Sequence, residues 1–344
     1  MIVGGIVMLL GGVVAAVNAY IAVAHSVSPF TGAYNWSASG FGTKFANPGT
    51  LPTGIGRGVA FSPAATEVVV GHDATPFITA YPWSASGFGT KFANPGTIPT
   101  GSGNCVAFSP AGTQIAVAHI NSPFTTAYPW SASGFGTKYA NPGTVPANDG
   151  RGVAFSPAGT EIAVASNQTP FINAYPWSAS GFGTKFANPA TLPAGTGRGI
   201  AFSPAGTEIA IVHTTTPYVT AYPWSGSGFG TKFADPTSAP SNTGFGVAFS
   251  PAGTELAVAF GASPYINAYN WSASGFGTKF TNPVTLPTGI GRIVAFSKAG
   301  TEIAVGHDTT PFITAYPWSV GGFGTKYANP TTLPTGLCSG VAFS

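Results

Sequence analysis

The segment AYPWSASGFGTKFANPGT, residues 80–97, recurs through the chain almost unchanged. The other copies start at six alanines: Ala33, Ala127, Ala174, Ala221, Ala268 and Ala315. The tryptophans mark a period of 47 residues: Trp36, Trp83, Trp130, Trp177, Trp224, Trp271 and Trp318. Residues 16–344 therefore hold seven units with no insertion or deletion. A fixed period of this length is typical of repeat architectures.

One unit, residues 152–198, predicts four short strands. GVAFS reads as a first strand, closed by the turn signal PAG at 157–159. TEIAVAS reads as a second strand and FINAY as a third. Because proline cannot donate to a ladder, the third strand is expected to end at about Tyr175, before Pro176. TKFAN, residues 184–188, is the expected fourth, outer strand.

Four strands per unit, repeated seven times without a helical period, predict an all-β fold: a seven-bladed β-propeller with four antiparallel strands per blade. A closed ring of blades buries the sheet faces that one blade alone would expose. The last unit stops after GVAFS, residues 340–344. We therefore expect residues 341–343 to form the innermost strand of the blade built from residues 19–47, beside residues 21–24, and so to close the ring.

The beginning of the chain, MIVGGIVMLLGGVVAAV, is apolar and carries no charge. It lacks the basic start of a signal peptide, and its four glycines weaken a membrane helix. We interpret residues 1–15 as an apolar, divergent start of the array, with a signal or anchor as the alternative. Residues 16–344 are expected to form one propeller domain, and residues 1–11 are not expected to span a membrane.

The segment VAFSPAGTEIAVA resembles the strand pair of WD40-like and YVTN-type propellers. This resemblance implies that the connections into first strands share one face with the turns between second and third strands. The Trp-Asp pair of WD40 blades is replaced by Tyr-Pro, or by Tyr-Asn at 34–35 and 269–270, and the Gly-His dipeptide is absent before the first strand. The WD40 His-Asp network is therefore not carried over. The wording is also similar to repeat proteins of environmental phages.

Composition excludes some classes of function. Charged residues make up only 6% of the chain, against about 25% in ordinary globular proteins. The net charge of +3 provides no basic footprint for nucleic acid. Two cysteines, Cys105 and Cys338, lie at different repeat positions and do not indicate a disulfide framework.

The units diverge most around one rim, which is where we expect a ligand if the protein binds one; neutral drift of surface loops is the alternative. Four units carry arginine just before the first strand, at Arg57, Arg151, Arg198 and Arg292. Asn104, Phe245 and Ser339 take that position in the other three. On the same implied face, five units end the second strand in histidine: His25, His72, His119, His213 and His307.

The rim formed by these four arginines and five histidines predicts an anionic or polar partner, because guanidinium groups form paired hydrogen bonds with anions. Binding is expected to strengthen below about pH 6.5, as the histidines protonate. The alternatives are arginines that stabilise turns and histidines bonded to loop carbonyls. We expect no metal site, because symmetry-related histidines in a ring point in different directions.

These observations predict a non-catalytic binding or structural propeller, because the near-identical blades offer no asymmetric catalytic constellation. A multivalent glycan-binding propeller is the alternative, with tryptophans stacking on sugars where exposed. A propeller enzyme ranks third. We expect no cofactor, a monomeric ring, an unidentified protein or glycan partner, no nucleic-acid or membrane partner, and an extracellular or virion-associated location.

Overall fold

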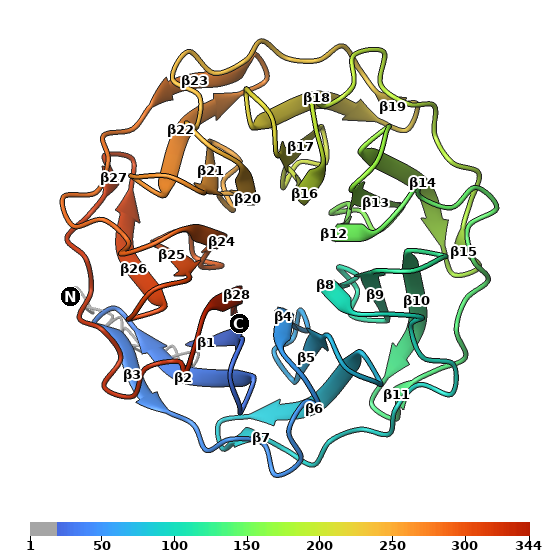
Figure 1. Ribbon diagram of the computed structural model, residues 1–344, viewed down its shortest axis with the longest axis vertical. Helices are drawn as coiled ribbons and strands as arrows, with labels where there is room; N and C mark the ends of the chain where they lie inside the picture. The colour runs from blue at the N-terminus through green and yellow to red at the C-terminus, as the bar shows by residue number, and fades with distance from the viewer. Residues whose placement is uncertain (1–18) are drawn as a thin grey trace, which may run out of the picture.

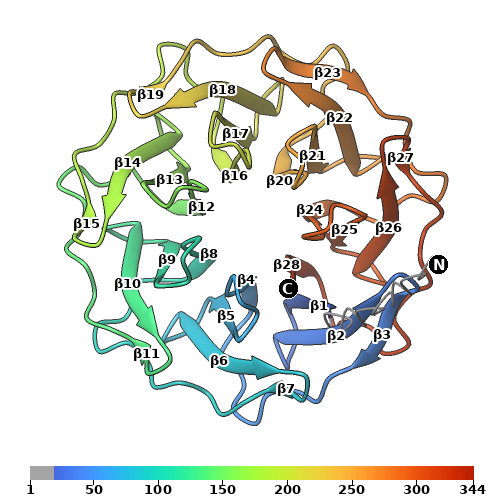
Figure 2. The same ribbon diagram turned by 180° about the vertical axis from the view of Figure 1, so that it is seen from behind.

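The protein is described by a computed structural model that covers residues 19–344. Seven four-stranded antiparallel sheets stand around a central axis, as the two views in Figure 1 and Figure 2 show. The predicted seven-bladed β-propeller is confirmed. The expectations for residues 1–15, and for a domain that begins at residue 16, concern positions outside the described residues in whole or in part.

Each blade places its strands in order from the axis outwards. The innermost strands are β4 (Gly56–Phe61), β8 (Gly103–Phe108), β12 (Gly150–Phe155), β16 (Gly197–Phe202), β20 (Gly244–Phe249), β24 (Gly291–Phe296) and β28 (Cys338–Phe343). The second strands are β1 (Ala19–His25), β5 (Glu67–His72), β9 (Gln114–His119), β13 (Glu161–Ser166), β17 (Glu208–His213), β21 (Glu255–Phe260) and β25 (Glu302–His307).

The outer half of each blade contains a long third strand and a short fourth strand. The third strands are β2 (Thr31–Ser37), β6 (Ile78–Ser84), β10 (Thr125–Ser131), β14 (Ile172–Ser178), β18 (Val219–Ser225), β22 (Ile266–Ser272) and β26 (Ile313–Ser319). The outermost strands are β3 (Gly40–Lys44), β7 (Gly87–Phe88), β11 (Gly134–Phe135), β15 (Gly181–Phe182), β19 (Gly228–Phe229), β23 (Gly275–Lys279) and β27 (Gly322–Phe323).

The ring closes as expected. Strand β28 pairs antiparallel with β1, with Val341 opposite Val23 and Phe343 opposite Ile21. Strands from the two ends of the chain therefore share one sheet, in the order β28-β1-β2-β3. The C-terminus lies close to the axis (Figure 1).

The expected end of the third strand at Tyr175 is wrong. Strand β14 runs through Pro176 to Ser178, and Pro176 lies opposite Glu161 in the ladder. The carbonyl of Pro176 accepts a bond from the Gly183 amide, so this residue presents its backbone to the outermost strand. The nitrogen of Pro176 points toward the outermost strand. Because of this, the absent N–H removes no hydrogen bond between the inner strands.

The expected outer strand at residues 184–188 is also wrong, because β15 lies earlier, at Gly181–Phe182. The outer strand has two residues where the third strand contains proline, but five in β3 and β23. Those two blades carry Asn35 and Asn270 in place of proline. Asparagine keeps the backbone N–H that proline lacks, which explains the longer pairing.

The core lies between neighbouring blades. Each tryptophan is at most 7% exposed and packs edge-on against aromatic rings, as Trp83 does against Phe45, Phe61 and Phe88. Each fully buried tyrosine on a third strand ties the preceding connection to its blade. Tyr81, for example, donates its hydroxyl to the carbonyl of Thr50 at 2.7 Å. In the part of the chain that the structure describes, no helix is long and apolar enough to cross a membrane.

Candidate functional site in the central cavity

The candidate arginines lie at a β-bulge that recurs in the innermost strands. In the first of these strands, Gly56 pairs with His72 and Gly58 with Gly71, so Arg57 has no partner across the ladder. The same interruption leaves Arg151 and Arg292 unpaired in β12 and β24. Bulges redirect a side chain and are common beside functional sites.

A glycine precedes the bulged residue in six of the seven innermost strands, where close packing between blades requires it. A Cβ on Gly56 would lie 2.1 Å from the carbonyl oxygen of Phe30, in the preceding blade. Gly150 and Phe124 repeat this contact at 2.2 Å. Only a glycine lets the two backbones approach so closely. The glycine-rich segments before the first strands therefore hold the bulge in place.

The bulged side chains surround a cavity of about 410 Å³ at the axis. All seven bulge positions line it: Arg57, Asn104, Arg151, Arg198, Phe245, Arg292 and Ser339. Aliphatic side chains two residues further along the innermost strands, among them Val59, Val106 and Ile200, also line it. The structure thus gathers the four predicted arginines around one cavity of the size that holds small ligands.

Three of the four arginines are neutralised by carboxylates. Nη2 of Arg57 lies 3.2 Å from Asp73, and Nη2 of Arg292 lies 3.3 Å from Asp308. Arg151 pairs with Asp149 at 3.1 Å. Each pair is partly exposed, so its contribution to stability is small.

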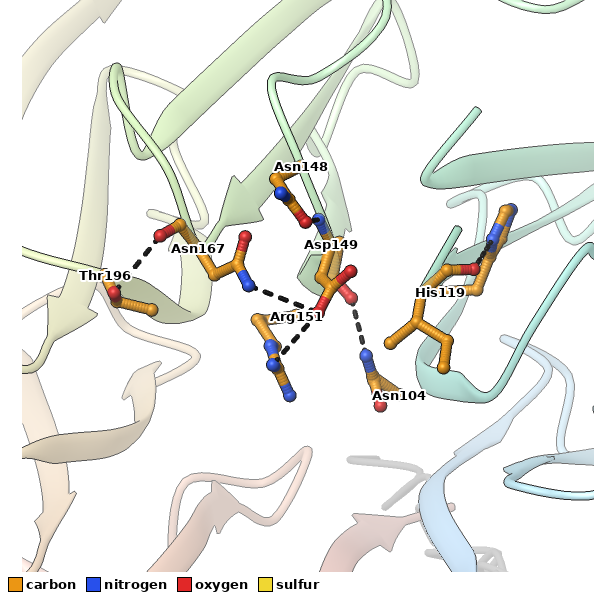
Figure 3. Close-up of polar contacts among 9 residues, drawn as sticks. Asn104, His119, Asn148, Asp149, Arg151, Asn167 and Thr196 are labelled. Atoms are coloured by element: carbon orange, nitrogen blue, oxygen red, sulfur yellow. Dashed lines mark hydrogen bonds and ion pairs between the residues drawn. The ribbon is translucent and has the colours of Figure 1, made fainter. Parts of the chain in front are cut away.

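Asp149 organises the rim between two blades. It accepts from Arg151 and, at 3.2 Å, from Nδ2 of Asn167 (Figure 3). Asn104, in the neighbouring blade, donates Nδ2 to the carbonyl of Gly150 at 2.8 Å. These bonds hold the side chains of Asn104 and Arg151 in place. Oδ1 of Asn104 has no hydrogen bond to another described residue.

Arg198 differs from the other three. No carboxylate among residues 19–344 forms an ion pair with it. Burial lowers the pKa of Arg198, and repulsion from Arg151 and Arg292 lowers it further. Its Nε, like that of Arg151 and Arg292, is buried without a hydrogen-bond partner among residues 19–344.

Phe245 links Arg198 and Arg292, which lie in the two blades on either side of it. The guanidinium carbon of Arg292 lies 4.7 Å from the ring centroid, and that of Arg198 lies 5.5 Å from it. The electron-rich face of an aromatic ring attracts cations. Phe245 therefore offsets part of the repulsion between the two guanidinium groups.

The five histidines do not line this cavity. They end the second strands and are at most 1% exposed: His25, His72, His119, His213 and His307. In four of them Nε2 bonds a threonine hydroxyl of the third strand, as His119 does with Thr126 at 2.7 Å. Figure 3 shows His119 apart from the Arg151 cluster, with its ring turned away from it.

The expected protonation of these histidines near pH 6.5 is wrong. Burial lowers the pKa of His25, His72, His213 and His307 to about 4, and it also lowers the pKa of His119. The protonated imidazole would carry its charge in a buried space between two strands, away from water, which disfavours protonation. These side chains therefore stay neutral at the pH at which anion binding was expected to strengthen.

The expected shared face is confirmed, because the connections into the first strands lie beside the turns between second and third strands. Thr53 donates to the carbonyl of Thr75 at 2.6 Å, and Thr100 donates to that of Ser122 at 2.8 Å. The opposite face carries a groove of about 150 Å³ between two blades, lined by Ser156, Thr160, Glu161, Trp224 and Ser225 among others. No group of three or more potential metal ligands occurs within residues 19–344.

Sequence reasoning placed the arginines correctly on one rim but did not pair them. Asp73 and Asp308 follow a histidine directly, and Asp149 lies two residues before its arginine, so no local pattern links the three carboxylates to the arginines. One signal was present: the arginine and the acidic residue recur together at the same spacing in two units, as 57 with 73 and 292 with 308.

Comparison with known proteins supports the fold. No protein-family model matches the chain. No curated protein matches it either. A proposed 6-phosphogluconolactonase from Bacteroides uniformis is similar in structure, with a TM-score of 0.75, 14% identity, and coverage of 95% of this chain and 99% of that one.

Two further structures are similar over nearly their whole length. A protein from Lactobacillus plantarum has a TM-score of 0.75, 14% identity, and coverage of 95% of this chain and 99% of its own. The periplasmic gluconolactonase of Pseudomonas aeruginosa has a TM-score of 0.72, 15% identity, and coverage of 94% and 99%. Identities this low speak for the fold, and this chain shares its seven-bladed propeller with lactonase-like proteins.

Proposed function

We propose that this protein is a non-catalytic binding propeller whose central cavity holds a small anionic ligand. The observation that carries the proposal is the gathering of four arginine side chains around one cavity, with one of them, Arg198, lacking a carboxylate partner among residues 19–344. Guanidinium groups bind carboxylates and phosphates through parallel hydrogen bonds. An extracellular or virion-associated location stays a prediction.

The lining of the cavity favours binding over catalysis. Its described residues are arginine, glycine, asparagine, serine, cysteine and apolar side chains. A hydrolase needs a positioned base near the reacting atoms, and neither histidine nor a carboxylate is among these residues. Cys105 is one of the lining residues, but its Sγ donates to the carbonyl of Val153 in the next blade. Burial also raises the pKa of this thiol, which opposes a role as a nucleophile.

Calorimetric titration tests the proposal with inorganic phosphate, benzoate and phthalate, and with neutral glucose as the contrast. We expect saturable binding of at least one anion at a stoichiometry of one per chain, and none of glucose. Replacing all four arginines with alanine should abolish that binding while circular dichroism stays unchanged. Single Arg→Gln variants cover the case in which the fourfold variant fails to fold. Absence of anion binding to the folded parent would overturn the proposal.

The enzyme alternative has its own test, because some similar structures are described as lactonases. Hydrolysis of glucono-δ-lactone and 6-phosphogluconolactone should proceed no faster with the protein than in buffer. Turnover that is lost in the Arg198→Gln variant would replace the binding role with a catalytic one.

The glycan alternative loses its expected stacking platform, because all seven tryptophans are buried. A glycan-array screen still separates the two faces. Binding that depends on Glu161, in the groove opposite the arginines, and not on Arg198 would favour a lectin.

A further inference from the structure

The free cation at Arg198 arises from a single substitution between repeats. Asp73 and Asp308 lie 16 residues after the arginines that they pair with, and Thr214 holds the equivalent position for Arg198. The three turns have the same length and keep the Thr-Pro pair that follows this position. Gly54, Gly195 and Gly289 each pack against this side chain in their own blade. The blade thus keeps the place for a carboxylate while lacking one.

The cavity therefore carries about one unmatched positive charge. The Arg57, Arg151 and Arg292 charges are each balanced by an aspartate. Arg198 is left, held beside Phe245 and between two guanidinium groups that repel it. A ligand with one negative charge would complete the pattern of the other blades. A second negative charge on the ligand would face arginines that already have partners.

The rest of the cavity is apolar. Beyond the ring of bulged residues, it is lined by Val59, Val106, Ile200, Val247 and Val341. Phe245 adds an aromatic surface beside Arg198. Such a surface stabilises an apolar body by removing it from water. The volume of about 410 Å³ limits that body to a small molecule.

From this geometry, which rests on the proposed binding function, we infer that the ligand is a small monocarboxylate with an apolar body. Its carboxylate would accept the hydrogen bonds of the Arg198 guanidinium, in the role that Asp73 and Asp308 play for their arginines. Its body would lie against Phe245 and the aliphatic side chains of the innermost strands.

Three ligands with one aromatic body separate charge from shape. Calorimetry at pH 7.5 should show that benzoate binds, that neutral benzamide binds at least about tenfold more weakly, and that dianionic phthalate gains nothing over benzoate. Equal binding of benzamide would overturn the role of the carboxylate. Binding of phthalate or phosphate without benzoate would overturn the monocarboxylate while leaving the proposed function intact. If none of these anions binds, the proposed function itself fails.

Two variants remove the free cation in different ways. Arg198→Gln deletes it, and Thr214→Asp supplies the missing partner while keeping the arginine. Both should weaken benzoate binding about tenfold or more. Lys185→Gln, at the outer edge, removes the same charge far from the cavity and should leave binding unchanged. Equal weakening in Lys185→Gln would reduce the effect to net charge and overturn the assignment.

Exchanging the partners moves the site. The double variant Thr214→Asp with Asp308→Thr pairs Arg198 and frees Arg292, which also contacts Phe245. Benzoate binding should recover relative to Thr214→Asp alone and should then depend on Arg292 instead of Arg198. A folded double variant that still depends on Arg198 would contradict the inference.

Discussion

Nε2 of His72 lies 2.9 Å from Oγ1 of Thr79, and both side chains are buried between the second and third strands of their blade. His119, His213 and His307 make the same contact with threonines of their own blades. The histidines that looked like ligand contacts in the sequence are thus part of the blade interior.

The first prediction concerns acid stability. Burial lowers the folded-state pKa of His72 to about 4, with Asp73 opposing this and Lys91 adding to it. A group with a lowered folded pKa favours folding only while it is neutral. Stability should therefore be complete above about pH 6.5 and fall between pH 6.5 and 4. Chemical denaturation across this range measures the change, and a flat profile would contradict it.

A matched control exists within the chain. In the blade of β13 and β14, Ser166 accepts from Nδ2 of Asn173 at 3.1 Å where four other blades pair histidine with threonine. The double variant His72→Ser with Thr79→Asn copies that pair. It should fold and should take up about one proton fewer on unfolding in this pH range.

The second prediction fills a missing partner. His25 has Gly32 where four other histidines face threonine, and its Nε2 is buried with no hydrogen-bond partner in the described part of the chain. A Cβ on Gly32 would lie 3.3 Å from Cε of Lys44, a flexible side chain that can move. Gly32→Thr should therefore raise the free energy of unfolding by about 1 kcal/mol. Gly32→Val, which has the same shape without the hydroxyl, should gain less, and equal gains would assign the effect to strand propensity.

The third prediction concerns ring closure. Val341 and Phe343 of β28 are the inner partners of β1 and pack between two blades. Deleting residues 340–344 removes them and exposes the edge of β1, so the melting temperature should fall markedly. Restoring the peptide in trans should recover part of the loss. A deletion variant as stable as the parent would show that closure does not depend on this strand.

The ring and its closure could be predicted because they depend on the 47-residue period and on a last unit that contains only its first strand, residues 340–344. The length of each outer strand could not, since it depends on whether proline or asparagine presents a backbone N–H to the edge. The lack of a carboxylate partner for Arg198 could not be predicted either. It becomes visible only when Thr214 is compared with Asp73 and Asp308, which hold the same position in two other units. The burial of the histidines follows from partners on a neighbouring strand, which spacing alone does not identify.

The last prediction concerns one contact between two blades, where three residues differ in size from their counterparts in other repeats. Gly306 lies opposite Ile293, whereas three other blades place alanine opposite glycine there, as Ala165 lies opposite Gly152. Cys338 of the next blade replaces the glycine that precedes the bulge elsewhere, and it is fully buried. A Cβ on Gly306 would lie 2.7 Å from Cγ2 of Ile293 and 2.8 Å from Sγ of Cys338.

Gly306→Ala alone should therefore destabilise the protein by about 1–3 kcal/mol, because an added methyl in a filled core forces its neighbours apart. The triple variant with Ile293→Gly and Cys338→Gly copies the residues of the blades that pair alanine with glycine, and it should recover most of that loss. Denaturant unfolding of the single and triple variants measures the coupling among the three sites. If the single variant is as stable as the parent, or if the triple variant recovers nothing, the three residues do not compensate one another.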